Sequence, residues 1–337
     1  MINAGIVGLG RWGQNLVNSI QGKSDKIRVV AGATRTRAPE AVEYAKKQGF
    51  PLVDSAAKLF ADPKIDAVII ATPHSQRVEL ITAAAQAGKH VFTEKPLTLT
   101  SDEAAVCLKA CAERKVTLAV GYNWRFQPAL QEIKRMLEDG RLGILQHIEG
   151  NFCGPSVYRY GPEHWRLQRN EGPAGGMTGR GVHVVDAMLY LAGRIDNVYA
   201  QSYRRTLDYG TDDTTSMLFK FKGGATGYLG TFIATAETWR MQVFGSNGWA
   251  EVGDVQHLTT WEMRVSYVNR DNLHQHHKPQ TITFPQTSTE RLELEHFADA
   301  VAAKRPLAVA GGDEAHNVAV LEAILASAEK HQPVMIG

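Results

Sequence analysis

Apolar and amphipathic segments alternate over the first 122 residues of the chain. Short apolar runs, which are typical of strands buried on both faces, cover 4–7, 27–33, 67–71, 90–93 and 117–120. Segments of helical length separate them, and the clearest cover 11–20, 39–48, 75–87 and 102–114. Alternating strands and helices predict a parallel sheet with right-handed crossovers.

The pattern changes after Asn123. A helix at 128–139 and a strand at 145–152 lead into an irregular stretch at 153–176, and another helix begins near His183. Strand-like runs, with no helical pattern between them, then follow at 198–204, 215–221, 227–233 and 240–245. We expect these strands to be antiparallel neighbours. Two helices, at 290–304 and 316–330, come last, so the chain is predicted to form two domains, 1–122 and 123–337.

The composition narrows the class of protein. The 337 residues are 44% hydrophobic and 21% charged, close to the average of soluble globular proteins. A formal net charge of +2 is too small to indicate a nucleic-acid or membrane partner, and no apolar run approaches membrane-spanning length. No targeting signal precedes the first strand. Three cysteines cannot all pair and lack metal-ligand spacing, so we expect a cytoplasmic protein without a metal site.

A glycine motif, Gly8-Leu9-Gly10-Arg11-Trp12-Gly13, follows the first strand and opens the first helix. Gly8 permits a tight turn, Gly10 lets the backbone approach a pyrophosphate, and Gly13 lets the helix pack closely on the strand. The N-terminus of the helix offers N–H groups and a positive dipole to phosphates. We assign this segment, with Arg11 and Trp12, to dinucleotide binding; a plain glycine turn is the alternative. The predicted first domain is therefore a Rossmann domain.

The end of the second strand indicates which dinucleotide is bound. NAD enzymes usually carry an acidic residue there for the ribose 2′-hydroxyl, but this chain has Thr34-Arg35-Thr36-Arg37. A hydroxyl beside arginines suits a 2′-phosphate, because guanidinium groups donate charge-assisted hydrogen bonds to it. We therefore predict NADP rather than NAD, with Thr34, Arg35 and Arg37 at the phosphate. Alternatively, both arginines are solvated loop residues.

Three further segments carry a family resemblance. They are Ala71-Thr72-Pro73, Gly88 to Pro96 (which contains Glu94-Lys95-Pro96) and Gly121-Tyr122-Asn123-Trp124-Arg125-Phe126. With the glycine motif, they make the chain resemble the Gfo/Idh/MocA oxidoreductases along nearly its whole length. The resemblance implies a Rossmann domain followed by an α+β domain with an open, mainly antiparallel sheet, through which homodimers or homotetramers form. It also implies hydride transfer between a nicotinamide and a hydroxyl-bearing carbon of a sugar, inositol or related polyol.

Lys95 is the candidate for proton transfer in the first domain. The resemblance implies that Lys95 lies near the nicotinamide and substrate. It also implies that the peptide bond before Pro96 is often cis. A lysine at the carboxyl end of a parallel strand also points into the crevice where such sheets bind ligands, and partial burial suits it to proton transfer. The alternative is a structural ion pair with Glu94. We assign the neighbouring residues Thr72, Pro73, His74 and Glu94 to the cofactor site.

The second domain departs from the family pattern. Relatives carry a motif of the form D-x-G-x-H-x-x-D, in which Gly181, His183 and Asp186 match here but Gly179 replaces the first aspartate. His183 remains a candidate acid or base. Three explanations stay open: the chemistry runs mainly through Lys95, the substrate carries a carboxylate that Arg180 or Arg166 binds, or catalysis is lost and binding is retained. His183 as a purely structural histidine is a further alternative.

The irregular stretch supplies further candidate substrate contacts. Aromatic rings beside polar donors suit a sugar-like ligand, so Trp165 and Arg166 join Lys95, Arg180 and His183 as expected substrate-binding residues. A loop packed by its own aromatic rings fits the same residues. The leading interpretation is an NADP-dependent dehydrogenase or reductase that needs no metal. A nucleotide-binding sensor without turnover and an NAD-assisted glycoside-cleaving enzyme are the alternatives.

Overall fold

The chain divides into two compact units. The computed structural model describes residues 1–275, 277–306 and 313–337. The first unit comprises residues 1–123 and 288–318, and the second comprises 124–287 and 319–337. The sequence assigned everything after residue 122 to the second domain, whereas the structure returns 288–318 to the first unit. Helix α8 (Thr289–Ala302) explains the difference, because its apolar face, with Leu294 and Phe297, joins the core of the first unit.

A parallel sheet forms the centre of the first unit. In the described residues it has six strands, in the order β3-β2-β1-β4-β5-β6. Their bounds are β1 Ile2–Val7, β2 Ile27–Ala33, β3 Leu52–Val53, β4 Ala67–Ile70, β5 His90–Glu94 and β6 Leu118–Gly121. The order changes direction between β1 and β4, which is the point where such sheets bind ligands at their carboxyl edge. The predicted Rossmann fold is confirmed.

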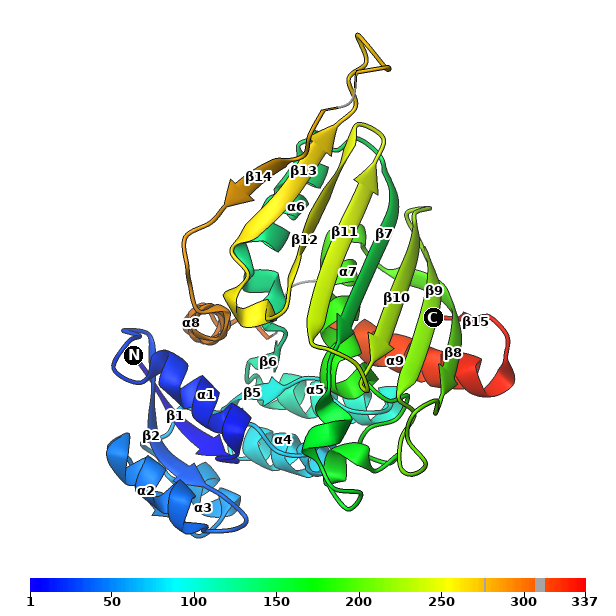
Figure 1. The fold of residues 1–337 in the computed structure, drawn as a ribbon. Helices are drawn as coiled ribbons and strands as arrows, with labels where there is room; N and C mark the ends of the chain where they lie inside the picture. Colours follow the sequence, from blue (N-terminus) through cyan, green and yellow to red (C-terminus); the bar gives the residue numbers. More distant parts are fainter. Residues whose placement is uncertain (276, 307–312) are drawn as a thin grey trace. The chain divides into compact units, whose positions relative to one another are not determined.

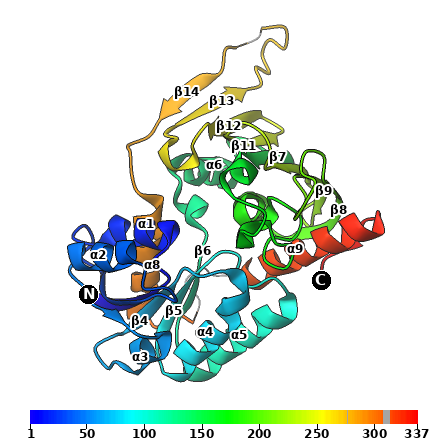
Figure 2. The ribbon, with the colours of Figure 1, turned by 60° about the horizontal axis from the view of Figure 1, so that its bottom comes forward.

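Helices cover both faces of this sheet, and they follow in chain order as α1 Arg11–Ile20, α2 Pro39–Lys47, α3 Ala56–Ala61, α4 Arg77–Gln86 and α5 Ser101–Arg114. Helices α1, α2 and α8 share one apolar core with the sheet, and α3, α4 and α5 share the other (Figure 2). The sequence missed β3 and α3 because a two-residue strand and a six-residue helix are too short to show a period.

A larger sheet forms the second unit (Figure 1). In the described residues it has nine strands, in the order β14-β13-β12-β11-β7-β10-β9-β8-β15. Their bounds are β7 Leu145–Cys153, β8 Ile195–Tyr203, β9 Thr214–Phe221, β10 Thr226–Phe232, β11 Thr238–Gly245, β12 Gly248–Asp254, β13 Glu262–Tyr267, β14 Gln280–Thr283 and β15 Val334–Met335. Helices α6 (Pro128–Glu138) and α7 (Val182–Ala192) lie against one face. Helix α9 (Asp313–Lys330) is divided between the two units.

The sheet is mainly antiparallel, as expected, with one correction. Successive strands pair from β8 to β10 and from β11 to β14. However, β10 and β11 are not neighbours, because β7 lies between them, parallel to β10 and antiparallel to β11. The irregular stretch and α7 carry the chain from β7 to β8, three strands away, and the chain then returns through β9 and β10 to pair with β7. No local sequence pattern encodes this insertion.

Two expectations from the sequence concern membrane-spanning segments and the state of the cysteines. None of the helices in the described ranges is long and apolar enough to cross a membrane. The three cysteines, Cys107, Cys111 and Cys153, are free and buried. Burial raises the pKa of the Cys107 and Cys111 thiols to about 12, so both behave as apolar helix residues.

Candidate functional site

The glycine motif forms the predicted turn from β1 into α1. Gly8 has a φ of +97°, and a side chain there would place its Cβ 2.5 Å from the Ala71 carbonyl oxygen. A Cβ on Gly13 would lie 2.0 Å from the Gly8 carbonyl oxygen, so only glycine lets α1 approach the strand this closely. A Cβ on Gly10, by contrast, would meet no atom within 4 Å. Open space beside the first residues of a helix fits a dinucleotide pyrophosphate.

Trp12 connects this turn to the end of β5. Its indole Nε1 donates a hydrogen bond to Glu94 Oε1 at 2.6 Å, and the Lys95 amide donates to Glu94 Oε2 at 3.3 Å. Glu94 is 5% exposed, and burial raises the pKa of its carboxyl group against the opposing effects of the Lys95 charge and the Trp12 hydrogen bond. The glycine turn and Lys95 are therefore held at the same edge of the sheet.

Arg77, to which the sequence assigned no role, also stabilises this edge of the sheet. Its buried guanidinium donates to the carbonyl oxygens of Thr72 (3.1 Å), Glu94 (2.6 Å) and Pro96. These bonds tie the end of β4 to the turn that follows β5. Lys95 is half-buried, and the Lys95–Pro96 peptide bond is cis. Pro73 is half-buried and His74 is buried beside Thr72 in the turn after β4.

The residues predicted to select NADP lie after β2. Thr34 is half-buried, whereas Arg35 and Arg37 are exposed. The Arg37 guanidinium donates to Asp54 Oδ1 at 2.9 Å, and Asp54 also pairs with Lys58. Arg37 therefore shares its charge with a carboxylate, and Arg35 is the more accessible cation for an anionic ligand.

In the second unit, His183 belongs to a cluster of aromatic rings. It is the second residue of α7, follows a π-helical turn at Met177–Gly181, and is 4% exposed. Its ring stacks on Trp124, with centroids 5.6 Å apart and planes inclined by 19°. Phe152 and His257 complete the cluster, at centroid distances of 6.1 and 5.9 Å from His183. Short π-helical turns are frequent at functional sites because they alter the direction of the following side chains.

Two charged residues of the motif are held by ion pairs. Asp186 is fully buried and accepts a bidentate hydrogen bond from Arg125, with both N···O distances at 2.8 Å. This pair joins the Tyr-Asn-Trp-Arg segment to α7, a contact that the sequence did not predict. Arg180 Nη1 lies 2.8 Å from Glu237 Oε1 and donates to the Cys153 carbonyl oxygen at 2.8 Å. Glu237 also pairs with Arg159 at 3.3 Å, so its carboxylate is shared between two guanidinium groups.

The position of Gly179 is open. Gly179 is exposed, and a Cβ there would meet no atom within 4 Å. A side chain as large as the aspartate of the family motif therefore meets no obstruction at its first carbon. The loss of this aspartate is a change of chemistry and not the result of close packing.

The aromatic residues of the irregular stretch stack on one another. The Tyr160 and His164 rings are 4.0 Å apart and nearly parallel, and Arg166 lies 4.3 Å from the centroid of the Trp165 ring. His164 Nδ1 accepts the Arg166 amide, while burial and then the Arg166 charge lower the pKa of this imidazole. Trp165 is half-buried and Arg166 is exposed. The loop is packed by its own rings, and part of this stack faces solvent.

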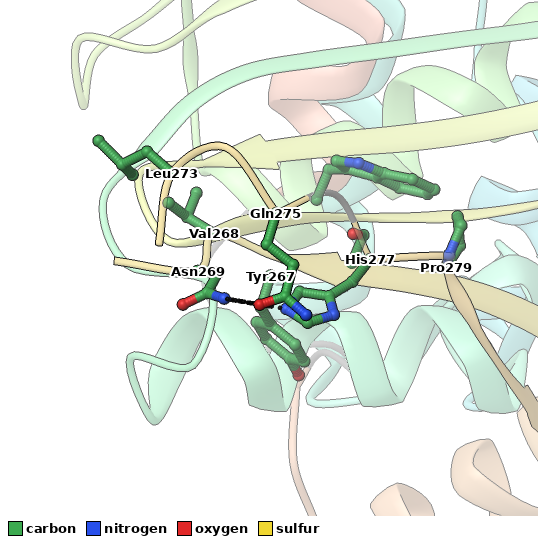
Figure 3. A pocket seen from close by; sticks show the side chains of 9 residues that line it. Tyr267, Val268, Asn269, Leu273, Gln275, His277 and Pro279 are labelled. Atoms are coloured by element: carbon green, nitrogen blue, oxygen red, sulfur yellow. Dashed lines mark hydrogen bonds between the residues drawn. The ribbon is translucent and has the colours of Figure 1, made fainter. Parts of the chain in front are cut away.

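A hollow of about 350 Å³ lies elsewhere in the second unit (Figure 3). Trp249 and Tyr267 line it near the start of β12 and the end of β13, and Asn269 donates to Gln275 across the loop. His257 follows the opposite end of β12, and seven strand residues span roughly 20 Å. The hollow is therefore distinct from the His183 cluster. Among the described residues, no group of three or more His, Cys, Asp or Glu is placed to hold a metal ion.

Comparison with known proteins agrees with this architecture. Residues 2–122 match the oxidoreductase family with an NAD-binding Rossmann fold, and residues 130–251 match the GFO/IDH/MocA C-terminal domain. Inositol 2-dehydrogenase of Rhizobium meliloti is 27% identical over 98% of both chains. D-xylose 1-dehydrogenase (NADP(+)) 2 of Haloferax volcanii is 28% identical over 96% of this chain and 97% of its own. The crystal structure of aldose-aldose oxidoreductase from Caulobacter crescentus superimposes with a TM-score of 0.87 at 25% identity, covering 99% of both chains.

The fold and the two groups of site residues define an oxidoreductase with an NAD(P)-binding Rossmann fold. The chain belongs to the Gfo/Idh/MocA family, as its motifs predicted.

Proposed function

We propose that this protein is an NADP-dependent dehydrogenase or reductase that acts on a hydroxyl-bearing carbon of a neutral sugar, inositol or related polyol. The observation that carries the proposal is the edge of the parallel sheet, where Trp12 and Glu94 hold the glycine turn beside Lys95. The names of the relatives, an inositol and a xylose dehydrogenase, support a polyol or sugar substrate.

The residues of this edge fit a nicotinamide dinucleotide. Gly8, Gly10 and Gly13 would hold its pyrophosphate, because the turn is tight and the space at Gly10 is open. The bound cofactor supplies a carbon that accepts or returns a hydride. Thr72, Pro73, His74 and Glu94 would line the same edge.

Lys95 and His183 would handle the proton of the reacting hydroxyl. Oxidation of an alcohol removes a proton from oxygen while a hydride leaves carbon, so a base must face the hydroxyl. Lys95 is half-buried at the end of β5, which suits this role. His183 would hydrogen-bond the substrate, and the face of Trp124 would stabilise positive charge on its imidazole.

NADP is proposed over NAD on the basis of Arg35. An exposed guanidinium at the end of β2 suits a 2′-phosphate, and no carboxylate occupies the sequence Thr34 to Arg37. Asp54 directly follows the next strand, β3, and pairs with Arg37. Arg35 therefore carries most of the proposed discrimination, with Thr34 and Arg37 as further contacts. The Haloferax relative named as NADP-dependent supports this choice.

A neutral substrate is proposed because Arg180 is already paired. Its guanidinium is already engaged by Glu237 and by the Cys153 carbonyl oxygen, both at 2.8 Å, which weakens the case for a sugar acid. Trp165 and Arg166 would contact the sugar from the stacked loop, where the exposed parts of the rings suit C–H faces.

A homodimer or homotetramer is proposed to form through the large sheet. One row of residues crosses its strands on the side opposite α6 and α7: Tyr199, Leu218, Tyr228, Glu149, Gln242, Glu251 and Arg264. Leu218 in this row is 55% exposed. The apolar half of this row would be buried in the interface, and the charged half would make specific polar contacts. A cytoplasmic location is proposed because the cysteines are free thiols.

A sensor without turnover is the second candidate. Gly179 favours it, because the carboxylate expected beside His183 is missing and its place is open. Lys95 and His183 favour the enzyme, because a protein that only binds has no use for two side chains suited to proton transfer.

The test follows reduced nicotinamide after incubation with NADP⁺, and separately with NAD⁺, against neutral sugars, inositols and sugar acids. The proposal predicts NADPH formation with one neutral class and a loss of about a hundredfold or more in kcat for Lys95→Ala. Tight NADPH binding without reduction of NADP⁺ by any compound would favour the sensor. Preference for sugar acids would contradict the neutral substrate, and release of a leaving group without net reduction would indicate glycoside cleavage.

A further inference from the structure

His257 is a histidine that no sequence motif marks, yet it lies in the ring cluster of His183. It begins a 3₁₀ turn, His257–Thr259, that follows β12. Its ring lies 4.8 Å from Phe152 in an edge-on arrangement, 5.8 Å from Trp124 and 5.9 Å from His183, measured between centroids. Three segments far apart in sequence therefore meet at His183.

A hydrogen bond from Trp124 fixes the proton on His257. The Trp124 indole Nε1 lies 2.9 Å from His257 Nδ1. An indole N–H can only donate, so Nδ1 must present its lone pair and the imidazole proton must be on Nε2. Protonation of Nδ1 would break this bond and leave a buried N–H without an acceptor, because Trp124 is 2% exposed. The bond therefore favours the tautomer of His257 that carries its proton on Nε2.

The segment that carries His257 is itself anchored. The Thr260 hydroxyl donates to the Gln256 carbonyl oxygen at 2.7 Å and accepts from Trp239 Nε1 at 2.9 Å. Gln127 Nε2 donates to the Thr260 carbonyl oxygen at 2.5 Å. These bonds fix the backbone before and after His257. The imidazole is therefore held in place to accept the Trp124 N–H.

Trp124 passes this constraint on to His183. The indole is packed against Trp239 on one side, with centroids 4.6 Å apart, and stacked on His183. With its N–H bonded to His257, the indole cannot turn or tilt out of its plane without losing a buried hydrogen bond. The plane of the His183 ring is therefore set by a chain of three rings that starts at His257.

We propose that His257 is a positioning residue: by accepting the Trp124 N–H, it holds the indole face that sets the orientation of the His183 imidazole. The inference rests on the proposed function only in giving His183 a role in proton transfer. The arrangement of rings is a property of the protein without ligands, so it is tested separately from turnover.

Two substitutions separate the acceptor from the ring. His257→Asn keeps an oxygen, Oδ1, close to the position of Nδ1, and His257→Leu removes the acceptor while keeping an apolar side chain. His147→Leu is the matched control, because His147 is a partly exposed histidine of the same sheet whose Nδ1 lies 2.7 Å from Thr226 Oγ1, away from the cluster. Thermal unfolding checks that each variant is folded.

The first readout is ¹⁵N NMR of the imidazoles in the ligand-free protein. The expected result is that His257 carries its proton on Nε2 in the wild type, and that the His183 ring signals shift in the Leu variant but not in the Asn variant or the control. A proton on His257 Nδ1, or His183 signals unchanged in the Leu variant, would overturn the proposal whether or not the protein turns over.

The second readout is steady-state kinetics with the substrate that the panel identifies. The Leu variant should lose about tenfold in kcat, because a misdirected proton-transfer group slows chemistry more than binding. KM for the cofactor should stay the same, and the Asn variant should recover most of the loss. Equal losses in the Asn and Leu variants would overturn the proposal. A silent wild type contradicts the proposed function, and the NMR result then decides the positioning role alone.

Discussion

Trp12 and Glu94 are 82 residues apart in sequence, yet the indole Nε1 of one lies 2.6 Å from Oε1 of the other. The bond joins the glycine turn after β1 to the residue that precedes Lys95. Because Glu94 is buried, its two oxygens must find donors within the protein, and they find the Trp12 indole and the Lys95 amide. The glycine motif and the segment around Lys95 are thus one structural unit.

Trp12→Phe tests this link. The variant keeps an aromatic ring but removes the N–H, which leaves a buried Glu94 oxygen without that donor. We expect NADPH to bind about fivefold more weakly, the equivalent of one ordinary hydrogen bond, with kcat also reduced because Lys95 loses its support. Fluorescence titration of NADPH measures the affinity. Trp249→Phe, in the hollow of Figure 3, is the control and should bind NADPH as the wild type does; equal affinities in both variants would show that the link is dispensable.

Arg35→Ala tests the choice of cofactor. Removal of an exposed guanidinium beside the proposed 2′-phosphate should weaken NADPH binding about tenfold and leave NADH binding unchanged, because only NADPH carries that phosphate. Calorimetric titration of the two cofactors gives both constants. Arg28→Ala is the matched control, since Arg28 lies near the opposite end of β2 and bonds Asn3. Equal weakening of both cofactors by Arg35→Ala would remove Arg35 from phosphate recognition.

The environment of Asp213 predicts that the free energy of unfolding depends on pH. It is 1% exposed and accepts the amides of Arg205, Thr206 and Leu207 at 2.8–3.1 Å. Burial acts to raise the pKa of this carboxyl, but the hydrogen bonds together lower it below its ordinary value of 3.8. A lowered pKa means that the stabilisation is complete above the unfolded-state pKa and is lost as the pH falls through the folded-state pKa.

Asp213→Asn should therefore cost about 2 kcal/mol of unfolding free energy at neutral pH, because bonds from amides to a charged acceptor are replaced by weaker ones. The difference from the wild type should shrink as the pH falls through the ordinary carboxyl pKa of 3.8 and into the lower range where the folded-state carboxylate gains its proton. Urea unfolding across this range measures it. A difference that is independent of pH would mean that Asp213 acts through packing and not through its charge.

The loop that Asp213 organises also supports the approach to His183. The Thr211 hydroxyl donates to the Gly172 carbonyl oxygen at 2.6 Å, and Thr215 donates to Ala174 at 3.1 Å. These contacts fix the irregular segment that leads into the π-helical turn before α7. His183 in α7 is thus supported by turns that lie far from it in sequence.

Leu218→Glu tests the proposed assembly. A carboxylate on the exposed sheet row would be buried without a partner if two copies pack face to face, which is strongly unfavourable. We expect the wild type to sediment as a dimer or tetramer and the variant to sediment as a smaller species at the same concentration. Val106→Glu is the control, because it makes the same change from apolar to acidic at an exposed position of helix α5, which is not part of this sheet. A monomeric wild type would refute the assembly, and a variant that assembles as the wild type does would move the interface to another surface.

The alternation of strands and helices was enough to predict five of the six described strands in the first unit's sheet, because buried parallel strands read as continuous apolar runs. The glycine motif was found in the same way, since it lies at a strand end that the pattern locates, whereas the segment around Lys95 was singled out by the family resemblance. By contrast, β7 in the middle of the second sheet and α8 in the first unit depend on long-range packing. Local periodicity carries no information about which distant strand becomes a neighbour.

The supporting residues of the site were the least accessible to sequence reasoning. Arg77 acts through three backbone carbonyl groups, and His257 acts through the indole of Trp124, so neither belongs to a motif of reactive side chains. Arg180 was expected to attract an anion, but a glutamate 57 residues further along the chain pairs with it. Such partners are defined by the fold, and only the structure brings them into view.

Deuterium transfer tests the central claim most directly. The protein is incubated with NADPH that carries deuterium at the reactive carbon of the nicotinamide, together with keto derivatives of neutral sugars and inositols, and mass spectrometry locates the label. The account predicts that one of these compounds gains deuterium on the carbon that becomes a secondary alcohol, and that Lys95→Ala abolishes the transfer. Label that stays entirely in the cofactor, under conditions where NADPH binds tightly, would contradict it.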